Sequence, residues 1–135
     1  MAAMVDSNVL LDLISEDRHW FDRSASGIDG IAEGHRLIIN PISYGEVSIR
    51  YSRIEDLEAA LPPEMFTREA LPYEAAFLAG KCFLAYRRRG GTRRSPLPDF
   101  LIGAHAAVAG YHLVTRDAAR YRTYFPTLPL VAPDI

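Results

Sequence analysis

Residues 4–10 read Met4-Val5-Asp6-Ser7-Asn8-Val9-Leu10. Two apolar residues, three polar residues and the start of an apolar repeat at helical spacing predict a short strand, a turn and a helix. Apolar residues 37–39 likewise precede a helix that opens near Ser43, and the strand expected at 111–115 precedes a short helix over 117–124. Strands that alternate with helices predict a parallel sheet covered by helices on both faces.

The remaining elements follow from the same periodicities. We expect helices over residues 9–14 and 19–33, a short helix around 57–61, a brief strand within 64–71, helices over 73–89 and 98–110, and a last strand at 130–131. In the helix over 73–89, Phe77, Gly80, Leu84 and neighbouring alanines form the expected apolar stripe. The predicted fold class is α/β, a three-layer α/β/α arrangement around a central parallel sheet, with residues 1–135 in one domain.

The composition is that of a folded globular protein, since 49% of the 135 residues are hydrophobic and 24% are charged. Fifteen basic residues against 17 acidic ones give a net charge of -2, which neither marks the chain as a nucleic-acid binder nor excludes that function. The single cysteine, Cys82, excludes an intramolecular disulfide and is expected to be buried. No export signal or membrane-length apolar run is visible, so we expect a cytoplasmic protein without a membrane partner.

Four acidic residues fall where the predicted strands end. Asp6 and Asp117 come directly after strands, Glu46 lies one turn into the helix after residues 37–39, and Asp99 opens the helix before the strand at 111–115. Ligands of open α/β sheets bind outside the carboxyl ends of the strands. We therefore expect these four side chains at one edge of the sheet, with the position of Asp99 inferred from topology alone.

Each acid taken singly has a structural explanation. Asp6, Asp99 and Asp117 are good helix N-caps, and the spacing of Ser43 and Glu46 fits a capping box. Taken together, four converging carboxylates would repel one another unless a cation lay among them. Hard divalent ions such as Mg²⁺ and Mn²⁺ prefer oxygen ligands and promote phosphodiester hydrolysis.

The motifs that carry these acids resemble those of the PIN-domain family, in the same order. They are residues 4–10, Ser43-Tyr44-Gly45-Glu46-Val47, Pro98-Asp99-Phe100-Leu101-Ile102-Gly103-Ala104-His105-Ala106 and Leu113-Val114-Thr115-Arg116-Asp117. The resemblance spans residues 4–117. Compact members are mostly VapC-type toxins, so it implies an endoribonuclease toxin of a toxin–antitoxin pair that uses Mg²⁺ or Mn²⁺ and cuts tRNA or rRNA. It further implies a cognate antitoxin and a homodimer.

Carried over by position, Asp6, Glu46, Asp99 and Asp117 match the acidic quartet of the family, and Asn8 and Thr115 match supporting polar positions. We hypothesise that Asp6 and Asp99 bind the metal most directly. Glu46 and Asp117 would hold metal-bound waters or a second ion, and one carboxylate would help to deprotonate the attacking water. Since the fourth acidic position varies in the family, Asp117 has the alternative role of tuning the site.

Arginines lie before the third acidic motif and within the fourth. Arg93 and Arg94, in the basic stretch over 86–94, are candidates for binding RNA phosphates, against the alternatives of a solvated helix end or a contact with an acidic antitoxin. Arg116 is a further candidate for a phosphate contact, and its alternative is a salt bridge that orders the carboxylates.

Two other functions are open: a non-catalytic PIN-fold interaction domain and a structure-specific DNA nuclease. The presence of all four acids speaks against the first, and the lack of room for accessory elements speaks against the second. The four histidines show no metal-ligand spacing, and we expect them, His105 included, to be structural or surface groups. No serine-hydrolase or nucleotide-binding glycine motif is present.

Overall fold

The computed structural model describes residues 2–15, 28, 36–91 and 97–132. Its strands are β1 (Ala2–Val5), β2 (Arg36–Ile39), β3 (Phe66–Arg68), β4 (His112–Val114) and β5 (Leu130–Val131). Its helices are α1 (Ser7–Ile14), α3 (Pro41–Ser48), α4 (Ile54–Ala60), α5 (Tyr73–Arg88), α6 (Leu97–Ala109) and α7 (Ala118–Tyr124). The predicted helix over residues 19–33 lies outside the described residues, apart from Ile28.

The strands form one parallel sheet in the order β3-β2-β1-β4-β5. In the pairing of the two central strands, Met4 lies opposite Leu113 and Val5 opposite Val114. Because neighbouring residues of a strand point to opposite faces, the sheet buries apolar side chains on both sides. The prediction of an α/β fold with a central parallel sheet is therefore confirmed.

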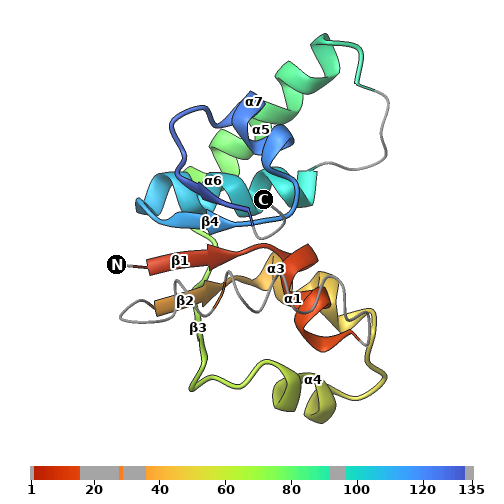
Figure 1. Ribbon diagram of the computed structural model, residues 1–135. Coiled ribbons are helices and arrows are strands. Elements are labelled where there is room, and N and C mark those ends of the chain that lie inside the picture. The colour runs from red at the N-terminus through yellow and green to blue at the C-terminus, as the bar shows by residue number, and fades with distance from the viewer. Residues whose placement is uncertain (1, 16–27, 29–35, 92–96, 133–135) are drawn as a thin grey trace.

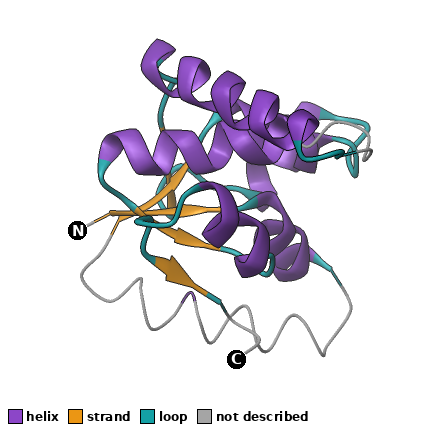
Figure 2. Ribbon diagram, turned by 90° about the horizontal axis from the view of Figure 1, so that it is seen from above, coloured by secondary structure: helices purple, strands orange, loops and turns teal. Residues whose placement is uncertain are grey.

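Two apolar cores, one on each face, fill the space between sheet and helices. Met4, Ile38 and Leu113 belong to the core under α5, α6 and α7, whereas Val5 and Ile39 belong to the core under α1, α3 and α4. Helices α5, α6 and α7 lie together in the upper part of Figure 1, and helices α1, α3 and α4 lie in its lower half. Seen from above in Figure 2, the strands lie together with helices grouped on two sides of them.

The apolar stripe predicted for α5 is wrong for Phe77, Gly80 and Leu84, which are exposed, whereas neighbouring alanines are buried. Phe77 and Leu84 are 69% and 41% exposed, and the side that faces the core carries Ala75, Ala79 and Cys82 instead. Small side chains at this spacing let α5 pack closely against α6, and they leave the large ones to solvent. Cys82 is buried as predicted, and burial raises the pKa of its thiol.

The start of α3 also differs from the prediction. The helix is capped by Asn40, whose side chain accepts hydrogen bonds from the backbone N–H groups of Ile42 and Ser43 at 3.0 Å each. The capping box joins Asn40 to Ser43, so Glu46 has no part in it. Asn40 also lies 3.1 Å from Nδ1 of His105, a residue of α6 that is buried and structural. The cap thus fixes the start of α3 against α6.

Other expectations agree with the structure to within a few residues. Gly90 and Gly110 follow α5 and α6 with φ values of +80° and +76°, where glycine is favoured over residues with a side chain. In the described residues, no helix combines the length and the apolar character that crossing a membrane requires.

Candidate active site

The site is built around the carboxyl ends of the two central strands. Asp6 follows β1 and Thr115 follows β4, and the Asp6 N–H continues the ladder by donating to the carbonyl of Val114 at 2.9 Å. This register places the two side chains next to each other, and the Thr115 hydroxyl donates to Asp6 Oδ2 at 2.8 Å. The sheet pairing therefore fixes the position of the Asp6 carboxylate.

Asp6 is only 2% exposed, and its carboxylate accepts three hydrogen bonds from the protein. Oδ1 accepts from the Ser7 N–H at 2.8 Å, and Oδ2 accepts from the hydroxyls of Thr115 and Tyr121. Burial and the negative charge of Asp99 nevertheless raise the Asp6 pKa from 3.8 to about 7. Asp6 thus serves as the N-cap of α1 and is at the same time a strongly perturbed acid.

Glu46, on α3, is held by a residue of α1. The Ser7 hydroxyl donates to Glu46 Oε1 at 2.7 Å, while the Ser7 backbone N–H donates to Asp6. Partial burial raises the pKa of Glu46, the hydrogen bond from Ser7 lowers it, and the charge of Asp99 raises it. Ser7 therefore sets the relative positions of two of the four predicted acids.

Asp99 and Asp117 are linked by a residue that the sequence analysis did not single out, Arg120. Its guanidinium Nη1 donates to Asp99 Oδ2, and its Nε lies 3.4 Å from Asp117 Oδ2. Asp99 lies in the first turn of α6, and Asp117 occupies the N-cap position of α7 without a capping hydrogen bond from its side chain. The capping explanation therefore fails for Asp117.

The predicted supporting residues Asn8 and Thr115 lie close to each other. The Asn8 side-chain amide is 3.5 Å from Thr115 Oγ1, and Asn8 Oδ1 accepts from the Arg116 N–H at 3.3 Å. The Asp117 N–H donates to Thr115 Oγ1 at 3.0 Å. Arg116 Nε forms a salt bridge of 3.0 Å with Asp12, so its ion pair lies with a residue of α1 outside the acidic quartet.

Of the basic stretch before Asp99, Arg93 and Arg94 lie outside the described residues. The arginines that end α5 lie over aromatic rings, Arg87 at 5.8 Å from the ring centre of Phe83 and Arg89 at 5.5 Å from that of Tyr124. Such cation–π contacts order the end of the helix. Their role toward RNA stays a prediction.

The model of the PIN domain matches residues 3–126 of this chain. The chain belongs to the PIN-domain family. A search of curated proteins finds no match. Solved structures with the same fold include VapBC2 from Rickettsia felis bound to a DNA fragment from its promoter, with a TM-score of 0.74, 18% identity and 98% of each chain covered. VapBC-1 from nontypeable Haemophilus influenzae reaches 0.76 with 18% identity over all of both chains. A toxin–antitoxin complex from Klebsiella pneumoniae reaches 0.68 with 21% identity over 97% of each chain.

Two further residues of this PIN domain contact the acids and were also missed from sequence. These are Ser7, in the first motif, and Tyr121, in α7. The Tyr121 hydroxyl donates to Asp6 Oδ2 at 3.0 Å, and burial beside Asp6 and Asp99 raises its pKa well above 10, so it stays a donor. For Arg120, the available sequence signal was its distance of three positions from Asp117, since side chains three positions apart lie on one face of a helix.

The acids of this PIN domain fit a divalent cation by chemical kind, because their carboxylate oxygens are hard ligands and Asp6 is held in a negative, desolvated environment. In the described part of the chain, no group of three or more histidine, cysteine, aspartate or glutamate side chains is arranged as a ligand set. Hydroxyls contact Asp6 and Glu46, and Arg120 contacts Asp99 and Asp117.

Proposed function

We propose that this protein is a divalent-metal-dependent endoribonuclease that hydrolyses RNA phosphodiester bonds, and that it is the toxin of a type II toxin–antitoxin pair. The observation that carries the proposal is the raised pKa of Asp6, a buried carboxylate in the field of Asp99 at the carboxyl edge of the sheet. Burial disfavours any charge, but the negative charge of Asp99, the second cause of this shift, favours a cation beside Asp6. Membership of the PIN-domain family supports a nuclease.

Each acid has a distinct role in this proposal. Asp6 and Asp99 hold the ion most directly, and Glu46 and Asp117 hold its water ligands or a second ion. A bound Mg²⁺ or Mn²⁺ supplies an activated water and stabilises the charge on the phosphate. One carboxylate helps to take the proton of the attacking water, and the products carry a 5'-phosphate and a 3'-hydroxyl.

The partners in this proposal are an RNA of the translation machinery, tRNA or rRNA, a cognate antitoxin that keeps the enzyme inactive, and a second copy of the chain. The antitoxin is supported by the solved structures of the same fold, several of which are toxin–antitoxin complexes. The homodimer is supported by Tyr73, Phe77 and Leu84, large exposed side chains at helical spacing on α5.

Cleavage of defined substrates tests the proposal. Antitoxin-free protein is incubated with total tRNA, rRNA and single-stranded and duplex DNA, each with Mg²⁺, Mn²⁺ or EDTA. We expect discrete cuts in RNA that need the ion and are lost in Asp6→Asn and Asp99→Asn. Asp56→Asn, the same chemical change at an exposed residue of α4, is the matched control and should cleave like the wild type.

The alternatives predict other results. Ion-dependent cuts in DNA with intact RNA would favour the structure-specific DNA nuclease. No cleavage of any substrate, together with no heat of ion binding in calorimetry, would favour the non-catalytic interaction domain.

A further inference from the structure

We infer that Arg120 is an internal counter-ion that competes with the divalent cation for Asp99 and Asp117, and so determines how tightly the site binds metal. The inference rests on the proposed metal-dependent function. It concerns a residue of α7 that neither the motifs nor the family resemblance assigns to the site.

The geometry of Arg120 is that of a cation shared between two acids. Its side chain is 15% exposed and contacts Asp99 through Nη1 and Asp117 through Nε. Asp117 precedes it by three positions on the same helix, whereas Asp99 belongs to α6. A planar guanidinium can donate hydrogen bonds to two carboxylates at once, which a single ammonium group does less well.

The surroundings explain why a cation is held there. The negative charge of Asp99 raises the pKa of both Asp6 and Glu46, so it acts on two other acids of the site. Arg120 places a positive charge beside Asp99 and Asp117 in this partly buried site, where the loss of one partner of an ion pair is destabilising. Arg120 therefore offsets part of the negative charge of the acids.

A metal ion bound by the same carboxylates would bring a second cation close to the guanidinium. Two cations a few ångströms apart in a partly buried site repel each other strongly. By linkage, the free energy by which a bound metal ion weakens the contacts of Arg120 equals the free energy by which Arg120 weakens metal binding. Removing the guanidinium should therefore tighten metal binding.

A purely structural role for Arg120 predicts the opposite change in metal affinity when Arg120 is removed. If its only effect were to tie α7 to α6, its loss would loosen Asp99 and Asp117 and would weaken metal binding. The direction of the change in affinity thus separates competition from support.

Titration calorimetry of the antitoxin-free protein with Mn²⁺, at fixed pH and ionic strength, measures that direction. We expect Arg120→Gln to bind Mn²⁺ roughly tenfold more tightly than the wild type, a change of about 1.4 kcal/mol. Arg120→Lys, which keeps the charge but cannot bridge both acids, should bind a few-fold more tightly. Arg122→Gln removes the same charge from an exposed position of α7 and should stay within about twofold of the wild type.

Thermal unfolding gives an independent measure. Without divalent ions, Arg120→Gln should melt below the wild type, because Asp99 and Asp117 lose their ion pairs with Arg120. Mn²⁺ should raise its melting temperature by more than it raises that of the wild type, because a ligand stabilises the state that binds it more tightly.

Unchanged or weaker Mn²⁺ binding in both Arg120 variants overturns the inference and leaves the metal-dependent nuclease standing. Equal tightening in Arg120→Gln and Arg122→Gln also overturns it, because the effect would then be one of overall charge. If neither the wild type nor the Arg120 variants bind Mn²⁺, both this inference and the proposed function fail. Arg120→Lys decides the question if Arg120→Gln does not fold.

Discussion

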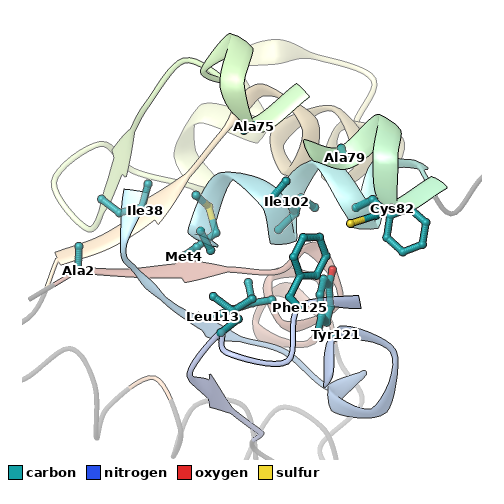
Figure 3. Close-up of a cluster of buried hydrophobic side chains, with 14 residues drawn as sticks. Ala2, Met4, Ile38, Ala75, Ala79, Cys82, Ile102, Leu113, Tyr121 and Phe125 are labelled. Carbon is teal, nitrogen blue, oxygen red and sulfur yellow. The ribbon is translucent and has the colours of Figure 1, made fainter. Parts of the chain in front are cut away.

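The phenol of Tyr121 donates a hydrogen bond of 3.0 Å to Asp6 Oδ2, which joins α7 to the residue that directly follows β1. Tyr121 is fully buried, and its ring packs beside Phe125 in the core under α6, as Figure 3 shows. The position of the most perturbed acid thus depends on how the last helix packs, as well as on the sheet.

Tyr121→Phe should raise the pKa of Asp6 above its value of about 7, because the lost hydrogen bond is one of those that lower it. A hydrogen bond to a charged group is worth about 1.5 kcal/mol, so the proton affinity of Asp6 should rise about tenfold and RNA cleavage should fall by up to the same factor. Carbon-detected NMR of the metal-free protein measures the pKa. Tyr124→Phe removes a hydroxyl from the same helix and is the control. Equal effects of the two variants would contradict a positioning role.

Asp6→Asn should change how stability depends on pH in the absence of divalent ions. The folded-state pKa of Asp6, about 7, lies above the ordinary value of 3.8, so the folded protein favours the neutral acid. The associated stability is fully present below pH 4 and is lost as the pH rises through 7. Asparagine imitates the neutral acid at every pH. At about 1.4 kcal/mol for each tenfold change in proton affinity, the variant should be more stable by about 4 kcal/mol at pH 8.

Urea unfolding in EDTA at pH 4 and pH 8 measures this difference. The two proteins should have similar stabilities at pH 4 and should diverge as the pH rises. Titrating groups that do not interact with Asp6 affect both proteins alike and cancel in the comparison. Parallel curves over the whole range would contradict the raised pKa of Asp6.

Ser7→Ala should raise the pKa of Glu46, because the hydroxyl that donates to Glu46 Oε1 at 2.7 Å is one of the influences that lower it. The backbone N–H that caps Asp6 is kept, so the loss of stability should be about 1 kcal/mol. NMR titration of Glu46 and urea unfolding measure the two effects. Ser48→Ala, whose hydroxyl bonds to the Gly45 carbonyl at an exposed position, should alter neither by a comparable amount.

Features of the site that follow from local sequence could be predicted. Asp6 directly follows β1 and Asp117 lies three residues after the end of β4, and parallel strands bring their carboxyl ends to one edge whatever the packing of the helices. The placement of Asp99 near them was inferred from topology, and its effect on the pKa of Asp6 is consistent with that placement.

Features that depend on side chains from separate elements could not be predicted. The pairing of Arg120 with Asp99 needs the docking of α7 against α6, and no spacing within one helix encodes it. The orientation of α5 was misjudged for a similar reason. Hydrophobicity favoured Phe77 and Leu84 as the buried stripe, but close packing against α6 selects small side chains such as Ala79.

Gly103→Ala tests the packing that positions Tyr121. Gly103 is buried in α6, and an added Cβ would lie 2.8 Å from ring atoms of both Tyr121 and Phe125. Because these rings fill a closed core, relieving the clash must shift α7, at a cost of about 1 to 3 kcal/mol. The displacement should also weaken the hydrogen bond from Tyr121 to Asp6 and lower the rate of cleavage. Urea unfolding and the cleavage assay measure the two effects.

Gly80→Ala is the matched control, because Gly80 lies in α5 and an added Cβ there meets nothing within 4 Å. With no clash, alanine should stabilise the helix by about 0.5 to 1 kcal/mol. The same substitution should therefore change stability in opposite directions in two neighbouring helices. Stabilisation by both variants would contradict the prediction, because it would show that the core around Tyr121 yields to an extra methyl group.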